Sequence, residues 1–317
     1  MRRLRVLIVA GVLAAWTPLA TGASGQNPQP PALPPQLPAF RSGVDVVSLT
    51  VTATDGAGRY VTDLAETEFE VYEDGAQQDV SFFTKTTLPL SVSVLIDTSA
   101  SMDDKMATVQ TAATGFVRQL RREDQAQLID FNSRVNVAVP FTGDQAVLEK
   151  GIRATAAGGS TALYNSVYIA LKELKKVQAR TATELRRQAI VLLSDGEDTS
   201  SLVSFDEVLE LAKRSETAIY AIGLKSKDIA TSKGFHEADY VLRQLTTQTG
   251  GRVFFPASVQ DLPAVYQQIS EELSSQYSLG YSSRNPKRDG RWRRVVVRLT
   301  RPSVAVRTKQ GYYGPSL

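Results

Sequence analysis

The sequence contains no cysteine, and this absence excludes a whole group of chemistries. Disulfide bonds, thiolate catalysis, cysteine-ligated zinc and a lipid-modified cysteine all require a residue that this chain lacks. Without disulfides, the fold depends on a hydrophobic core, and 317 residues with 42% hydrophobic side chains leave room for one large domain and a smaller one. The absence is easier to reconcile with a bacterial envelope protein than with an animal extracellular protein.

Histidine is almost absent as well. His236 is the only one, so a Ser-His-Asp hydrolase would have to use it. It lies in a polar stretch that we interpret as a loop between a strand ending near Leu224 and a helix near Tyr240, and no Gly-x-Ser-x-Gly elbow occurs. The sequence therefore predicts no catalytic residues and a protein that is not an enzyme. A metal-dependent hydrolase, either a phosphoesterase or a protease, is the alternative from another class.

Long apolar runs are limited to the first residues. A basic start is followed by an apolar run from Val6 to Trp16 and then by small residues up to Ser24, which is the order of a secretory signal peptide. We predict a signal peptide over 1–24, cleaved near Ala23. A retained anchor is the alternative, but the run is shorter than the roughly 20 residues of a spanning helix. The mature protein is expected to be secreted or periplasmic, with no transmembrane segment.

Net charge is small once the signal is removed. Without its three arginines the chain carries 33 basic and 33 acidic residues, so its basic isoelectric point indicates little about nucleic acid. We expect no nucleic-acid partner. The clusters Arg186–Arg187 and Arg291–Arg294 are expected to be solvated faces.

The rest of the chain divides by composition. Residues 25–42 are rich in proline, which removes amide donors, and are expected to form an extended tether. Residues 43–88 and 277–317 alternate in hydrophobicity like antiparallel strands. Neither segment has enough strands for a stable sheet, so we predict that the two pair into one small β domain.

The region 89–276 between them alternates short buried strands with helical stripes of apolar residues. The expected strands are 92–96, 127–129, 189–193 and 218–222, and the clearest stripes run over 102–120, 163–174 and 262–273. This order predicts an α/β fold with a doubly wound, mostly parallel sheet covered by helices on both faces.

The stretch that follows the first of these strands carries the most chemistry. The strand ends in Asp97, and Ser99 and Ser101 follow at alternate positions. Ligands bind at the carboxyl ends of the strands in such sheets, so these oxygens are candidate ligands. The alternative is that a serine only caps the next helix, because Ser101-x-x-Asp104 fits a capping box.

Two further stretches end in oxygen donors. The turn Gly158–Gly159 leads to Thr161, and the strand Ile190–Leu193 is followed by Ser194 and Asp195, although a helix cap and a simple turn would explain each alone. Together they form a set of hard oxygen ligands without His or Cys, which favours Mg²⁺ or Mn²⁺, with Ca²⁺ as a weaker candidate.

Three other carboxylates near strand ends are expected not to be ligands. Asp130, which ends the strand over 127–129, is interpreted as a structural carboxylate. Glu197 and Asp198 are interpreted as parts of a solvated loop.

The site residues resemble the metal-ion-dependent adhesion site of the von Willebrand factor type A (VWA) family. That motif is Asp-x-Ser-x-Ser, a distant Thr and a distant Asp, and it maps onto Asp97, Ser99, Ser101, Thr161 and Asp195. The resemblance covers about 90–276 and implies a six-stranded Rossmann-like sheet. It also implies one Mg²⁺ or Mn²⁺ ion that binds an Asp or Glu carboxylate of a protein ligand.

The whole chain further resembles a bacterial family of secreted VWA-related proteins, known mainly from acidobacteria. The resemblance rests on Val61–Leu64 and Phe69–Gly75 near the start and on Tyr277–Tyr281 and Gly311–Tyr313 near the end. It implies an exported adhesion or scaffold protein. A structural envelope module whose site is not used is a second alternative.

Overall fold

The structure is a computed structural model that describes residues 46–85, 88–180, 186–195, 197–224 and 233–316. The signal peptide and the tether predicted over 1–24 and 25–42 lie outside these residues. Within the described ranges, every helix is too short or too polar to cross a membrane.

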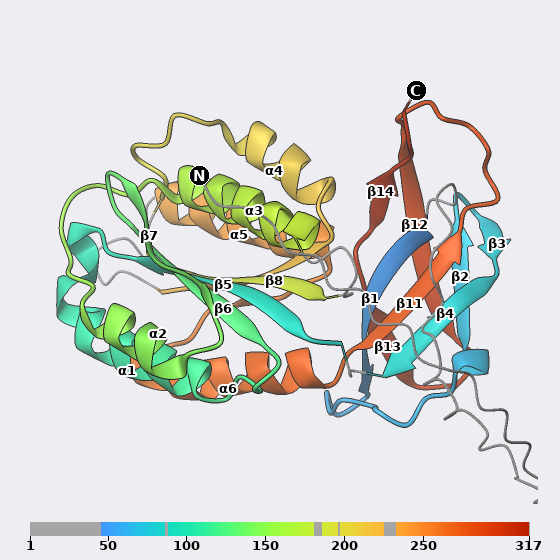
Figure 1. Cartoon of the computed structure of the whole chain (residues 1–317), viewed down its shortest axis with the longest axis horizontal. Helices are drawn as coiled ribbons and strands as arrows, with labels where there is room; N and C mark the ends of the chain where they lie inside the picture. The colour runs from blue at the N-terminus through green and yellow to red at the C-terminus, as the bar shows by residue number, and fades with distance from the viewer. Residues whose placement is uncertain (1–45, 86–87, 181–185, 196, 225–232, 317) are drawn as a thin grey trace, which may run out of the picture. The chain divides into compact units, whose positions relative to one another are not determined.

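The middle of the chain forms a six-stranded sheet in the order β10-β9-β8-β5-β6-β7 (Figure 1). The strands are β5 (Leu90–Asp97), β6 (Gln125–Phe131), β7 (Val135–Thr142), β8 (Arg187–Ser194), β9 (Thr217–Gly223) and β10 (Val253–Phe254). Only β7 runs antiparallel to its neighbour, and the other pairs are parallel. The predicted α/β class and the mostly parallel sheet are confirmed.

Helices cover both faces of this sheet (Figure 1). One face packs against α1 (Met106–Val117), α2 (Gln145–Arg153) and α6 (Leu262–Ser274), and the other against α3 (Leu163–Arg180), α4 (Phe205–Lys213) and α5 (Lys233–Thr249). Short 3₁₀ helices are η1 (Glu66–Glu68), η2 (Ala100–Lys105) and η3 (Val259–Asp261).

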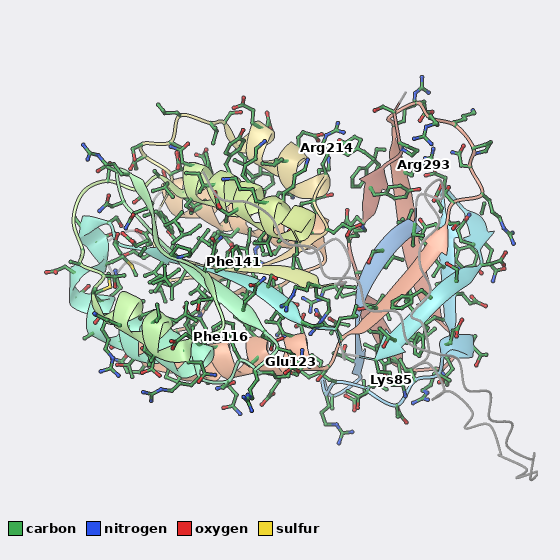
Figure 2. The ribbon with its side chains drawn as sticks, in the orientation of Figure 1. Lys85, Phe116, Glu123, Phe141, Arg214 and Arg293 are labelled. Carbon is green, nitrogen blue, oxygen red and sulfur yellow. The ribbon has the colours of Figure 1, made fainter. Side chains whose placement is uncertain are left out.

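The sheet's side chains divide between two cores, as strand geometry requires. Val94 and Ile96 of β5 point into the core of α1, α2 and α6, whereas Leu95 points into the other core. In the first core Phe116 of α1 packs against Tyr266 of α6, with ring centroids 5.4 Å apart (Figure 2). Because both faces are covered, β5, β8 and β9 are buried along their whole length.

The position of His236 corrects one prediction. The helix α5 begins at Lys233, so His236 lies in its first turn and not in a loop. The apolar stripe of this helix starts only near Val241, which is buried with Leu245. A polar first turn leaves no apolar periodicity in the sequence. Periodicity therefore predicts a helix start near Tyr240, later than the true start.

The segments on either side of the α/β region share two four-stranded antiparallel sheets, β13-β1-β11-β4 and β14-β12-β2-β3. Their strands are β1 (Val46–Asp55), β2 (Phe69–Glu73), β3 (Ala76–Gln78), β4 (Val80–Lys85), β11 (Tyr277–Ser282), β12 (Trp292–Leu299), β13 (Val304–Arg307) and β14 (Gly311–Tyr313). The strand β11 lies between β1 and β4, and β12 pairs with β2. Each sheet thus needs both ends of the sequence, and one apolar core lies between them.

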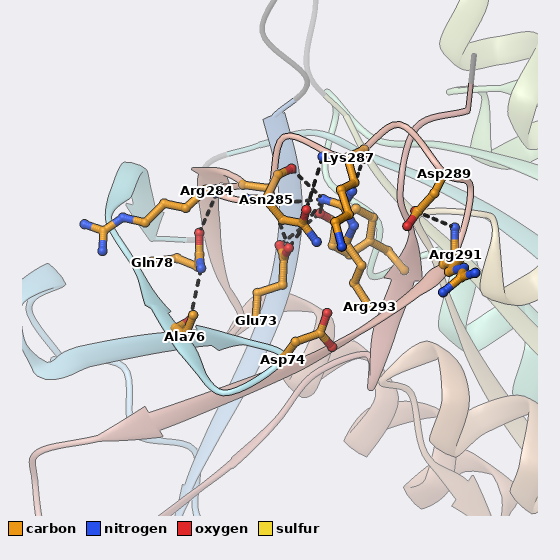
Figure 3. A network of polar contacts seen from close by, with 12 residues as sticks. Glu73, Asp74, Ala76, Gln78, Arg284, Asn285, Lys287, Asp289, Arg291 and Arg293 are labelled. Atoms are coloured by element: carbon orange, nitrogen blue, oxygen red, sulfur yellow. Dashed lines mark hydrogen bonds and ion pairs between the residues drawn. The ribbon is translucent and has the colours of Figure 1, made fainter.

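A buried ion pair organises this β domain (Figure 3). Arg293 and Glu73 are each 2% exposed in their side chains and lie 3.4 Å apart. The Glu73 carboxylate also accepts hydrogen bonds from the hydroxyls of Tyr281 and Tyr312, both at 2.9 Å. Arg293 in turn donates to the carbonyl oxygen of Asn285, which fixes the loop after β11. Buried charges are tolerated when they are paired and hydrogen-bonded in this way.

The two basic clusters therefore differ from the prediction that they are solvated faces. Arg293 is buried in the pair with Glu73, and Arg187 is 7% exposed and donates to the Leu273 carbonyl oxygen and to Gln276. The run of basic residues in the sequence hides the strand alternation, which turns one arginine of each cluster inward.

Glu272 of α6 joins the α/β region to the β domain. Its carboxylate accepts hydrogen bonds from Tyr220 at 2.7 Å and from Thr52 of β1 at 3.3 Å, and it pairs with Arg307 of β13. The side chain of Glu272 is completely buried, and that of Arg307 is 30% exposed. Burial, followed by the nearby Glu272 charge, raises the pKa of Tyr220 well above its usual value, so the phenol stays a donor.

A second contact joins α4 to β14. The Arg214 guanidinium lies 3.8 Å from the ring centroid of Tyr313, and the Tyr313 hydroxyl donates to Glu210 at 2.5 Å (Figure 2). The contacts of Glu272 and of Tyr313 thus fix α6 and the end of α4 to the β domain.

Two glycines give opposite expectations for alanine substitution. A Cβ at Gly251 would lie 1.9 Å from the carbonyl oxygen of Ile219, whereas a Cβ at Gly115, inside α1, has nothing within 4 Å. We expect Gly251→Ala to lower the free energy of unfolding by about 2–3 kcal/mol through overpacking. Gly115→Ala should raise it by about 0.5–1 kcal/mol, because alanine favours the helix. Urea unfolding measures both, and equal effects would contradict the packing of the 250–251 turn against β9.

Glu272 gives a second test of the fold. Glu272→Ala leaves Arg307 and Tyr220 without their buried acceptor and should lower the free energy of unfolding by about 3 kcal/mol. The matched control is Glu271→Ala on the same helix, where the exposed side chain accepts a hydrogen bond from Gln267 and the expected change is within about 0.5 kcal/mol. Similar midpoints for the two variants in urea would show that Glu272 does not join the two parts.

Candidate functional site

The candidate site lies at the carboxyl edge of the six-stranded sheet. The strands β5 and β8 are parallel neighbours, with Ile96 opposite Leu193. Asp97 is the last residue of β5, and Asp195 follows the last residue of β8. Parallel strands end at the same edge, so the two carboxylates are brought together by the strand order alone.

Asp97 is completely buried and held by two donors. The backbone amide of Ser99 donates to its Oδ1 at 2.8 Å, and the hydroxyl of Ser194 donates to its Oδ2 at 2.5 Å. Burial raises the pKa of Asp97 and the nearby Asp195 charge adds to this, while the bonds from Ser194 and Ser99 act in the opposite direction. The carboxylate is thus fixed in position in an environment that disfavours negative charge.

Ser99 and Ser101 connect the two carboxylates. Their hydroxyl oxygens lie 3.2 Å apart, and the Ser101 hydroxyl donates to Asp195 Oδ1 at 2.7 Å. Ser99 has the backbone position of an N-cap for η2, but its side chain makes no capping hydrogen bond. The hydroxyls therefore point into the site, and the structure does not use them in the capping arrangement that the sequence left open.

Thr161 lies at the same edge but outside this hydrogen-bonded group. Its amide donates to Thr199 Oγ1 at 2.9 Å, and among the described residues no hydrogen bond joins its hydroxyl to the other four predicted ligands. Its loop is held to the Asp97 turn by hydrogen bonds from Gly158 N to Thr98 O and from Ala100 N to Gly159 O. Gly159 has a φ of 84°, and a Cβ there would lie 2.6 Å from Ser133 Oγ, so the close approach of this loop requires glycine.

Lys105 is part of the site, although its sequence context did not predict this. Its ammonium group pairs with Asp195 Oδ2 and donates to the Ser101 carbonyl oxygen at 2.6 Å. The signal that could have found it is its spacing, four residues after Ser101, because a helical turn brings such positions together.

The neighbouring carboxylates have local roles. Asp130 accepts a hydrogen bond from Asn136 across the β6–β7 pair at 2.9 Å, which fits a structural carboxylate. Asp198 accepts from the amide of Tyr164 at 3.1 Å and from the hydroxyl of Ser201 at 2.5 Å, so it holds its loop to the first turn of α3. Asp198 is half-buried in this loop, as is Glu197, and Asp198 also supplies an acceptor that the helix start needs.

The donor set fits a hard divalent cation better than a transition metal. It combines two carboxylates with hydroxyls, and within the described residues no group of three or more His, Cys, Asp or Glu side chains could hold a metal ion. Mg²⁺ and Mn²⁺ accept oxygen ligands and keep several waters, so few protein carboxylates are needed. Asp97, Ser99, Ser101 and Asp195 are the residues placed to hold such an ion directly or through water, with Thr161 beside them.

Two curated relatives match part of the sequence. An uncharacterized protein of Synechocystis sp. is 24% identical over 194 residues, which cover 59% of this chain and 42% of that protein. An uncharacterized protein of Borreliella burgdorferi is 32% identical over 117 residues, which cover 36% of this chain and 32% of that protein. The chain therefore spans less than half the length of these relatives.

A comparison with solved structures supports the α/β fold described above. A von Willebrand factor type A protein from Catenulispora acidiphila superposes with a TM-score of 0.50 at 11% identity, covering 87% of this chain and 76% of that chain. At this identity the likeness shows the fold alone. The sequence profile of the von Willebrand factor type A domain matches residues 91–268, which is more than half of the chain. With this match over the α/β region that contains the site, the chain belongs to the von Willebrand factor type A domain family.

Proposed function

We propose that this chain is an exported, non-enzymatic binding module that captures an acidic side chain of a partner protein through a divalent cation. Asp97, Ser99, Ser101, Thr161 and Asp195 hold the cation, which is Mg²⁺ or Mn²⁺. The observation that carries the proposal is the continuous group of oxygen donors from Asp97 through Ser99 and Ser101 to Asp195, built from two neighbouring strand ends.

The charges of this group support capture of a carboxylate. Neutral hydroxyls add coordination without adding negative charge, so the cation attracts an incoming carboxylate more strongly than it would among carboxylate ligands alone. Mg²⁺ also keeps exchangeable waters, so an incoming Asp or Glu has a position to take. A partner's carboxylate would replace a water at this position and add a charge-assisted contact to the cation.

The arrangement around the cluster supports binding more than turnover. Asp97 is fully buried and fixed by Ser99 and Ser194, so its carboxylate is positioned as a ligand. Of the other titratable groups described near the cluster, only Lys105 contacts it, and this ammonium is engaged with Asp195. General acid-base chemistry needs a group free to exchange a proton with a substrate.

The first residues of the sequence support export. Arg2, Arg3 and Arg5 precede the apolar run Val6–Trp16, which is the composition of a secretory signal. The partner would then be met in the periplasm or outside the cell.

Metal binding is tested by calorimetry with Mg²⁺ and Mn²⁺ on the mature protein. We expect saturable binding to one site, and loss of that binding in Asp97→Ala and in Asp97→Asn, because the site loses one of its two carboxylates. The matched control is Asp130→Asn, which removes a carboxylate from the end of the neighbouring strand β6 and should leave the dissociation constant within about twofold. No saturable binding by the wild type, or unchanged binding by both Asp97 variants, would refute the site.

Partner capture is tested by a pull-down from an envelope extract, with immobilised wild type or Asp97→Ala protein. We expect a protein retained by the wild type in Mg²⁺, released by a chelator and absent from the variant. Retention that is unaffected by the chelator would instead favour a structural module whose site is not used. Turnover of generic phosphoester or peptide substrates that requires Asp97 would favour the hydrolase.

A further inference from the structure

The side chain of Lys105 occupies part of the candidate cation site. Lys105 is the last residue of the 3₁₀ helix η2, which also contains Ser101, and its ammonium contacts both Asp195 Oδ2 and the carbonyl oxygen of Ser101. The side chain is 13% exposed, and that of Asp195 is completely buried. An ammonium with these contacts neutralises Asp195 without any added ion.

Both oxygens of Asp195 are therefore already engaged. Oδ1 accepts the hydroxyl of Ser101 at 2.7 Å, and Oδ2 pairs with Lys105. A divalent cation that coordinates Asp195 must compete with this ammonium for the same carboxylate, and two positive centres at such short range repel each other strongly where water is excluded.

We propose that Lys105 is a tethered competitor of the metal ion. This inference rests on the proposed function, because it concerns the same site. Without metal, Lys105 holds Asp195 and Ser101 in place. When a metal ion binds, Lys105 leaves Asp195 and turns outward. The strength of the Lys105–Asp195 pair therefore sets the metal-ion concentration above which the protein binds its cation.

The structure offers an alternative partner for the released side chain. Asp104 precedes Lys105, lies 3.9 Å from its ammonium and is 71% exposed. An outward turn of Lys105 therefore moves its charge from a buried carboxylate to an exposed one. It also frees the carbonyl oxygen of Ser101 from Lys105, so metal binding changes the contacts within η2, directly before α1.

Amine reactivity of the wild-type protein tests the displacement directly. Brief acetylation with and without saturating Mg²⁺, followed by peptide mass spectrometry, should show several-fold greater modification of Lys105 in the presence of the ion. The exposed Lys150 on α2 is the internal control and should not change. Equal or lower modification of Lys105 at a Mg²⁺ concentration that saturates the calorimetric binding would overturn the inference.

Calorimetry with Mg²⁺ alone tests the competition. Lys105→Met should bind Mg²⁺ at least tenfold more tightly than the wild type, and Lys150→Met, which removes the same charge elsewhere, should bind within about twofold of it. A long-range charge effect would fade between 50 and 500 mM NaCl, whereas direct competition at buried Asp195 should persist.

The outcomes separate the two proposals. Binding by the wild type with no gain in Lys105→Met and no change in Lys105 reactivity refutes the competitor and leaves the metal site standing. No Mg²⁺ or Mn²⁺ binding by the wild type or by Lys105→Met refutes both. The reactivity measurement needs only the wild type, so it decides the question even if Lys105→Met does not fold.

Discussion

The structure depends on placing two carboxylates, Asp97 and Asp195, at adjacent strand ends with little access to water. Like charges in such a place repel each other, and burial raises the pKa of Asp97. Ser194 and Ser99 donate to Asp97, while Ser101 and Lys105 donate to Asp195. The local sequence around these two carboxylates is thus explained by the need to compensate negative charge, and the divalent cation that we propose would do so more completely.

The fold supplies the rigidity that this arrangement needs. Because β5 is hydrogen-bonded to β6 on one side and β8 on the other, Asp97 cannot move without disturbing the centre of the sheet. The glycine turn before Thr161 is bonded to the same strand end. A second buried carboxylate, that of Glu272, fixes α6 to the β domain. Its negative charge is also compensated, by an ion pair and by hydrogen bonds from hydroxyl groups.

Periodicity and strand ends predicted much of this structure. The continuous apolar run before Asp97 indicated a strand buried on both faces, and every residue of β5 is buried. The meeting of Asp97 with Asp195 followed from parallel strands ending at one edge. The shared sheets of the β domain followed from counting strands that could not form a sheet alone.

What the sequence did not predict are contacts between charged residues far apart in the chain. Arg293 and Glu73 look like ordinary surface residues in the sequence, and only the pairing of β12 with β2 buries them together. Lys105 appears as one basic residue among charged neighbours, although it reaches Asp195, ninety positions later. Such pairs leave no periodic pattern in the sequence. Their contribution to the free energy of folding depends on burial, which is set by tertiary packing.

The compensated cluster around Asp97 and Asp195 is the cation site that we propose. The most direct measurement is diffraction from crystals of the mature protein grown with Mn²⁺, using the anomalous signal of the metal. We expect one strong peak beside the hydroxyls of Ser99 and Ser101, at about 2.0–2.2 Å from the coordinating oxygens, with Lys105 turned away from Asp195. No peak at this edge of the sheet, with the Lys105–Asp195 pair intact at saturating Mn²⁺, would contradict it.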